Sequence, residues 1–175
     1  MSASPSRFAA EWISTLAAPA PGSLRALDVA MGRGRHALLL ARRGFHTFGV
    51  DLKLDAVREA TQLAAREGLQ VHGWCADLTV SRLPVRAFDI VVVTRYLQRD
   101  LFPAIKESLT AGGCVIYETF TVAQRVLGTG PTSADHLLRP GELPLAFSDW
   151  DVMFYEEVDR PEAVARLVAR RPFKS

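Results

Sequence analysis

Residues 28–36 read DVAMGRGRH. The stretch begins with the last two residues of an apolar run at 24–29 and ends at the start of a helical pattern that covers residues 35–43. A strand that turns into a helix through glycines is typical of the ligand-binding turn of open α/β sheets. Gly32 and Gly34 can adopt positive φ and bring backbone amides close to a ligand at the helix N-terminus. The stretch therefore predicts a binding site for a polar or anionic ligand at the end of a first strand.

Short β-branched runs alternate with helical patterns along the rest of the chain, which indicates a parallel sheet with crossover helices. We expect strands at residues 24–29, 46–50, 69–74, 88–93 and 114–117, and an antiparallel hairpin of residues 150–156 and 163–169. We expect helices at residues 35–43, 55–67 and 97–109, a short helix that starts at 140–143, and a first helix that starts at Ser4-Pro5. The run at 88–93 is continuously apolar, so it should lie in the middle of the sheet. The predicted fold is α/β, a doubly wound, seven-stranded, mostly parallel sheet with helices on both faces.

The composition excludes a disordered, a collagen-like or a coiled-coil protein. With 175 residues, 49% hydrophobic and 23% charged, the chain matches one globular domain, in which residues 1–22 form a helix and linker and 23–175 form the core. The formal net charge of +2 does not require a nucleic-acid partner. No apolar stretch approaches the roughly 18 residues of a membrane span, and no signal-peptide pattern begins the sequence. We therefore expect a cytoplasmic protein.

Cysteines and histidines give no sign of a disulfide or a metal site. Cys75 and Cys114 lie far apart in apolar runs, so we expect two buried, reduced thiols. The four histidines are scattered along the chain, and no metal is expected.

Three acidic residues follow successive predicted strands. Asp28 ends the first, Asp51 lies at the tip of the second, and Asp77 follows the third. The carboxyl ends of parallel strands meet at one edge, where open α/β sheets bind ligands. A carboxylate at the second tip can accept hydrogen bonds from both hydroxyls of a ribose. The pattern therefore predicts a nucleoside-containing cofactor.

With these motifs the sequence resembles the class I S-adenosylmethionine-dependent methyltransferases, from Leu24 to about Glu157. The resemblance implies a Rossmann-like fold and S-adenosyl-L-methionine as cofactor. It also implies that the glycine turn holds the methionine part and ribose, and that the next two strand ends hold the ribose hydroxyls and adenine. The cofactor-binding residues that it implies are Asp28, Ala30, Gly32, Gly34, Asp51, Leu52, Asp77, Leu78 and Thr94. One departure is Ala30, which stands where the family has its first glycine.

A narrower resemblance points to a small bacterial branch related to the tellurite-resistance and thiopurine types. Its motifs are GRHAL at 34–38, YETF at 117–120, LLRPGEL at 137–143 and YEE at 155–157. This resemblance supports the cofactor and leaves the acceptor open.

Candidates for the catalytic side follow the fourth and fifth strands and begin the first helix of the core. They are Arg95, Tyr96, Glu118 and His36. An arginine could bind a carboxylate or oxyanion of the acceptor, Glu118 or His36 could accept a proton, and Tyr96 with Phe120 could wall the pocket. Gln124 is a further candidate, and the glycine-containing segment 123–138 is a candidate lid.

The acceptor is expected to be a small molecule that receives the methyl group by direct in-line transfer. Val93-Thr94-Arg95-Tyr96 stands where amino-directed DNA methyltransferases have an Asn-Pro-Pro-Tyr motif, and neither cysteine lies in a catalytic loop. The cluster of Arg33, Arg35, Arg42 and Arg43 could contact phosphates, but its last two members fit a solvated helix face better. We therefore expect no nucleic-acid or membrane partner, and a monomer or homodimer.

Two alternatives stay open. Gly32, Gly34 and Ala37, with Asp51 about twenty residues after the start of the motif, also satisfy the fingerprint of NAD(P)-binding Rossmann proteins. Against this, Asp28 would repel a pyrophosphate, and no substrate domain follows the sheet. The second alternative is an inactive methyltransferase-like partner protein.

Overall fold

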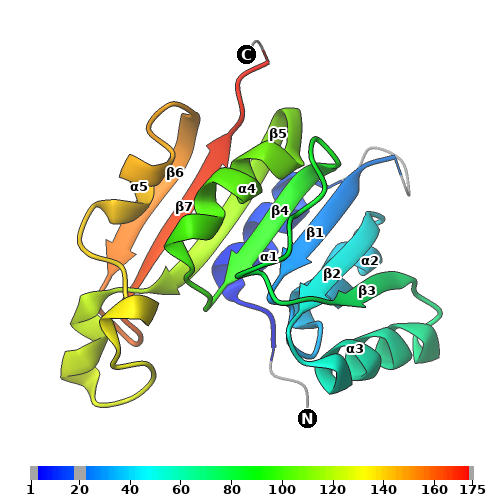
Figure 1. The fold of residues 1–175 in the computed structure, drawn as a ribbon, viewed down its shortest axis with the longest axis horizontal. Coiled ribbons are helices and arrows are strands. Elements are labelled where there is room, and N and C mark those ends of the chain that lie inside the picture. Colours follow the sequence, from blue (N-terminus) through cyan, green and yellow to red (C-terminus); the bar gives the residue numbers. More distant parts are fainter. Residues whose placement is uncertain (1–3, 18–22, 174–175) are drawn as a thin grey trace.

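A computed structural model describes residues 4–17 and 23–173. Within these residues seven strands form one sheet in the order β3-β2-β1-β4-β5-β7-β6 (Figure 1). The strands are β1 (Arg25–Val29), β2 (His46–Asp51), β3 (Val71–Cys75), β4 (Phe88–Thr94), β5 (Leu109–Phe120), β6 (Asp151–Val158) and β7 (Val164–Arg170). The first five run parallel, and β7 is antiparallel to both β5 and β6. The predicted Rossmann-like fold is confirmed, including its C-terminal hairpin and the central position of β4.

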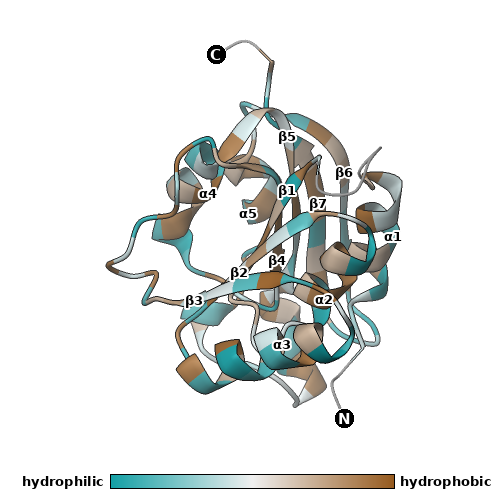
Figure 2. Ribbon diagram, turned by 90° about the vertical axis from the view of Figure 1, so that its right-hand side faces the viewer, coloured by the Kyte–Doolittle hydropathy of each residue, from teal (hydrophilic) through white to brown (hydrophobic). Residues whose placement is uncertain are grey.

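Helices cover both faces of the sheet (Figure 2). On one side lie α1 (Arg7–Thr15), α2 (Arg35–Arg42) and α3 (Leu54–Arg66), and on the other lie α4 (Phe102–Ser108) and α5 (Glu142–Ala146). The apolar run of β4 alternates between the two cores, with Ile90 and Val92 packed in the cluster with α1 and α2, and Val91 and Val93 in the cluster with α4 and α5. Burial on both faces explains why this strand carries no polar alternation.

The first helix is capped by its own Ser6 and packs against β6, the strand at one edge of the sheet. The hydroxyl oxygen of Ser6 caps α1 by accepting a hydrogen bond from the amide of Ala9. Phe8 and Trp12 pack against Phe154 of β6, with ring centroids 5.5 and 5.9 Å apart. The helix thus begins two residues later than Ser4-Pro5. The predicted linker at 18–22 lies outside the described residues.

Two sequence-based expectations about the middle of the chain are wrong. The helix expected at 97–109 is a short 3₁₀ turn, Arg99–Leu101, followed by α4, which ends at Ser108 because β5 already begins at Leu109. Gly112 and Gly113, expected as a stop, lie inside β5 and continue its ladder through hydrogen bonds with the backbone of Arg171. The positive φ of Gly112, 75°, lets this end of the strand bend without breaking the pairing.

The cysteines also differ from expectation. Cys114 is buried in β5, but Cys75 is exposed. It ends β3, the edge strand of the sheet, where a side chain has no neighbouring strand on one side.

The segment after β5 is irregular, as predicted. It contains two 3₁₀ helices, Val122–Leu127 and Ala134–His136, and leads to α5. In Figure 1 it lies at the carboxyl edge of the sheet, at the lower left. Among the helices of the described residues, none has the length and apolar character to cross a membrane.

Candidate functional site

The turn between β1 and α2 is built on left-handed backbone. Ala30, Gly32 and Gly34 have φ values of 53°, 54° and 79°. The amide of Met31 donates to the carbonyl of Val50, so the turn is tied to the end of β2. Alanine in this conformation is strained, because its Cβ approaches the backbone. The turn therefore holds Ala30 in a strained backbone conformation.

The two glycines of the turn have different surroundings. A Cβ added at Gly34 would lie 2.7 Å from the Cβ of Ala60, so this glycine lets α2 pack closely on α3. A Cβ added at Gly32 would meet no atom within 4 Å. Gly32 thus faces open space, where a ligand can approach the backbone.

Asp51 joins the tip of β2 to this turn. Its Oδ2 accepts a hydrogen bond of 2.8 Å from the amide of Gly32, and its Oδ1 accepts one of 2.9 Å from the amide of Lys53. These two donors fix the orientation of the carboxylate. Each oxygen keeps a lone pair for a further donor, such as a ribose hydroxyl.

Two hollows meet at the turn. The larger, about 640 Å³, is lined by Gly32, Arg33 and Asp51 together with the start of α3. The smaller, about 310 Å³, shares Gly32 and Arg33 and extends along Ala30 and Arg35 to Thr94 and Arg95 at the end of β4. An elongated ligand could therefore reach from the tip of β2 to the tip of β4.

The leucines that follow Asp51 and Asp77, both expected near adenine, differ in their exposure to solvent. Leu52 is 64% exposed beside Asp51, whereas Leu78 is buried in the core on the α4 side. Asp77 is exposed, and its Oδ1 accepts hydrogen bonds from the hydroxyl and the amide of Thr79. These bonds hold the pKa of Asp77 below its usual range. Leu52 thus offers an exposed apolar surface, while the side chain of Leu78 packs in the core beneath the turn at residues 77–79.

Asp28 is buried beneath the turn. Its Oδ2 accepts a hydrogen bond of 2.9 Å from the amide of Ala37 in α2. Burial raises the pKa of Asp28 from 3.8 to about 7, although this amide and the charge of Arg35 act in the opposite direction. Both protonation states are therefore accessible near neutral pH.

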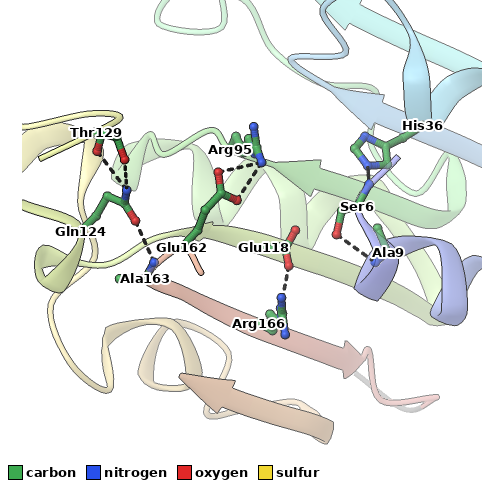
Figure 3. Close-up of polar contacts among 10 residues, drawn as sticks. All are labelled: Ser6, Ala9, His36, Arg95, Glu118, Gln124, Thr129, Glu162, Ala163 and Arg166. Carbon is green, nitrogen blue, oxygen red and sulfur yellow. Dashed lines mark hydrogen bonds and ion pairs between the residues drawn. The ribbon is translucent and has the colours of Figure 1, made fainter. Parts of the chain in front are cut away.

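His36 links three segments, and Figure 3 shows its contact with Ser6. Its Nε2 accepts a hydrogen bond of 3.0 Å from the amide of Ser6, and its Nδ1 lies 3.1 Å from the hydroxyl oxygen of Thr94. Because an amide can only donate, Nε2 carries no proton, and the neutral ring donates from Nδ1 to Thr94. Burial, together with Arg35 and Arg95, lowers the pKa of His36 to about 3. The ring is thus neutral and fastens α1 and β4 to the start of α2.

The charged residues at the ends of β4 and β5 pair with residues in β7 or just before it (Figure 3). Arg95 donates two hydrogen bonds, of 2.7 and 2.9 Å, from Nη2 to Glu162. Buried Glu118 accepts a hydrogen bond of 2.6 Å from Arg166, which also pairs with Glu156 at 2.8 Å. Glu118 and Glu156 are both register partners of Arg166, so strand pairing places the three side chains in a row.

Tyr96 and Gln124 are also engaged. The hydroxyl of Tyr96 donates to Oε1 of Gln98 at 2.5 Å, and burial raises the pKa of this tyrosine. Gln124 is buried, and it donates to the carbonyl of Thr129 and accepts from the amide of Ala163. It therefore ties the segment after β5 to the start of β7.

Of the four candidate catalytic residues, the structure brings only Arg95 to the lining of the smaller hollow. His36 lies behind Thr94, Glu118 lies in the row with Arg166, and Tyr96 packs against the core on the α4 side. Sequence reasoning missed Arg166, Glu162 and Ser6. Arg166 has a signal, since it stands between apolar residues in the interior of β7.

A family described as "Methyltransferase domain" matches residues 26–113, just over half of the chain. Hemagglutinin 1 of Eikenella corrodens is 26% identical over 144 residues, which are 76% of this chain and 46% of that protein, so the chain spans about half of its length.

Many solved structures have a similar fold, and two of them serve as examples. An S-adenosylmethionine-dependent methyltransferase from Mesorhizobium loti is 22% identical with a TM-score of 0.71, over 93% of this chain and 98% of that one. TehB from Haemophilus influenzae is 18% identical with a TM-score of 0.72, over 93% of this chain and 61% of that one. At these identities the structures establish the fold.

Proposed function

The chain belongs to the methyltransferase-domain family, whose cofactor is S-adenosylmethionine, and we propose that it transfers the methyl group directly to a small-molecule acceptor. The observation that carries this proposal is the pair of hollows that meet at Gly32. They reach from Asp51, whose carboxylate would bind the ribose, to Thr94 and Arg95 at the centre of the edge.

The residues of the site fit this cofactor. Asp51 would accept hydrogen bonds from the ribose hydroxyls, with its carboxylate held in place by two backbone amides. Leu52 would cover one face of the adenine. The open space in front of Gly32 gives the nucleoside room to approach the turn, and the part of the smaller hollow beside Ala30 and Gly32 would hold the methionine part.

When bound, S-adenosylmethionine supplies an electrophilic methyl group on a sulfonium. The task of the protein is then to align an acceptor atom with that group and to exclude water. Thr94 and Arg95 line the place where the acceptor would lie, and His36 fixes the hydroxyl of Thr94 through its Nδ1 proton. In this arrangement His36 acts as a positioning residue, and the acceptor loses its proton without help from the imidazole.

The sheet order favours this function over dinucleotide binding. Dinucleotide-binding sheets have the parallel order 3-2-1-4-5-6. Here the antiparallel β7 lies between β5 and β6. The calorimetric titration that follows also tests the alternative of an inactive methyltransferase-like protein.

Calorimetric titration with S-adenosylmethionine, S-adenosylhomocysteine and NAD tests the proposal. We expect the native protein to bind the first two, and Asp51→Ala to weaken them about tenfold or more, because hydrogen bonds to a charged group are lost. Asp159→Ala, which removes an exposed carboxylate in the turn between β6 and β7, is the matched control. Binding of NAD alone would contradict the proposal, and binding of none would support the inactive relative.

The lid role of residues 123–138 stays a prediction. Arg99 holds the second half of this segment by donating to the carbonyl of Leu137 and to Glu142. Limited proteolysis with and without S-adenosylhomocysteine tests it, and unchanged cutting within residues 128–133 would contradict a lid.

A further inference from the structure

We propose that Arg35 and Arg95 form a binding site for a carboxylate or a comparable oxyanion in the smaller hollow. This inference rests on the proposed function, because it concerns a group carried by the cofactor or by the acceptor. The two arginines line the hollow together with Thr94, which His36 holds from behind.

Arg35 is the first residue of α2 and is half-buried. Among the described residues, no side chain or carbonyl accepts a hydrogen bond from its guanidinium, and no carboxylate pairs with it. A guanidinium has five N–H donors and cannot give up its charge. Removing such a group from water without a partner is unfavourable. The position therefore favours an acceptor that the described residues do not supply.

The charges around Arg35 do not supply that acceptor. Burial and the positive charge of Arg95 lower the pKa of Arg35, while Asp28, Glu118 and Glu162 act in the opposite direction from a distance. Each of these three carboxyls already has a closer partner, which is the amide of Ala37, the guanidinium of Arg166 and that of Arg95, respectively. Three arginines thus line one hollow. Arg33 pairs with Glu59 and Arg95 pairs with Glu162, whereas Arg35 has no direct counterion among the described residues.

Local structure also disfavours a cation at this position. The N-terminus of a helix carries a partial positive charge, so arginine at the first helical position is unfavourable for folding. Arg95 is strained as well, with a φ of 54° directly after β4. Residues that break local rules in this way are expected at binding sites. The stability of the fold therefore does not explain Arg35, whereas Arg95 has its ion pair with Glu162.

Two guanidinium groups at one hollow suit an anion with several oxygens. Arg95 uses only Nη2 on Glu162, so its Nε and Nη1 keep donors for a ligand. A carboxylate or oxyanion can accept paired hydrogen bonds from such a fork. It can come from the amino-acid end of the cofactor or from an anionic acceptor.

The first arm of the test compares S-adenosylhomocysteine with 5′-methylthioadenosine, which keeps the nucleoside and thioether but has no carboxylate. Affinities are measured by calorimetry for native protein, Arg35→Met, Arg35→Lys and Arg43→Met, the last being a matched loss of charge at the exposed end of the same helix. If the cofactor supplies the carboxylate, native protein and Arg43→Met prefer S-adenosylhomocysteine, and Arg35→Met reduces this preference about tenfold. Arg35→Lys should retain part of it.

The second arm titrates benzoate and sulfate into the same proteins, with and without 5′-methylthioadenosine. If the acceptor supplies the anion, native protein and Arg43→Met bind one of these probes, and Arg35→Met does not. The inference is overturned if Arg35→Met changes neither the preference for S-adenosylhomocysteine nor the binding of both probes. Failure of native protein to bind either nucleoside would instead count against the proposed function, and the probes without nucleoside would still decide the inference.

Thermal unfolding separates binding from a structural role. Since the cation opposes the helix N-terminus, Arg35→Met should unfold at the same or a higher temperature than native protein. A lower unfolding temperature with unchanged binding in both arms would show that Arg35 serves the fold.

Discussion

The two halves of the carboxyl edge satisfy their polar groups in opposite ways. At β1 and β2 the Asp51 carboxylate is held by backbone amides, and the space in front of Gly32 is open. At β5, β7 and β6 the charged side chains are paired with one another, with Arg166 between Glu118 and Glu156. The first half is thus prepared for a ligand by the main chain. In the second half these charged side chains satisfy one another and leave no room for a ligand's charge. Arg35 and Arg95 lie between the two halves.

Removing the central charge of the row should have the largest effect. Arg166→Met leaves Glu118 buried without a partner, which we expect to lower the free energy of unfolding by about 4 kcal/mol in urea titrations. Glu156→Gln, which leaves the buried pair intact, should cost far less. The double variant Glu118→Gln with Arg166→Met should recover part of the loss. A single-variant loss below about 1 kcal/mol would contradict a buried, closed row.

The glycines of the turn test whether the first half is open. Gly34→Ala combines left-handed strain with overlap on Ala60, so we expect a loss of about 3 kcal/mol in the free energy of unfolding. Gly32→Ala has the strain alone and should lose less stability, but its methyl group enters the hollow and should weaken S-adenosylhomocysteine. Urea unfolding and calorimetry of both variants measure the two effects. Equal loss of stability at both positions would contradict the difference in surroundings.

Asp28 makes the first half sensitive to pH. Because its pKa rises from 3.8 to about 7 on folding, the folded protein keeps a proton that the unfolded chain releases between these values. The contribution of Asp28 to the free energy of unfolding therefore falls as the pH rises through this range. Asp28→Asn keeps an acceptor for the amide of Ala37 and removes the titration. Relative to native protein, we expect this variant to gain about 3 kcal/mol between about pH 4 and pH 7. Parallel pH profiles for the two proteins would contradict the prediction.

Ala30 gives the smallest expected effect. Ala30→Gly relieves left-handed strain but adds backbone freedom to the unfolded chain, so we expect a net gain of about 1 kcal/mol in urea unfolding. Ala146→Gly, at the last residue of α5 and without left-handed strain, should lose stability and serves as the control. A loss at both positions would show that the strain at Ala30 is negligible.

Much of the fold was predictable because its signals are local. The glycine turn, the apolar run of β4 and the breaks after α2 and α3 predicted the parallel sheet and its central strand. The expected stop at Gly112 was wrong because pairing with the chain near Arg171 carries β5 through these glycines. Exposure of Cys75 was missed for a related reason, since it depends on which strand forms the edge of the sheet.

The sequence by itself determined the strand-turn-helix motif and the carboxylate at the tip of β2, because main-chain conformation and residue spacing there depend on near neighbours. Only the tertiary structure decided which side chains are free. Glu118 meets Arg166 through strand register, His36 meets Ser6 and Thr94 through the packing of α1, and Arg35 lies at a hollow without a direct partner among the described residues. Such pairings join residues far apart in the chain, and their partners are set by how the layers pack.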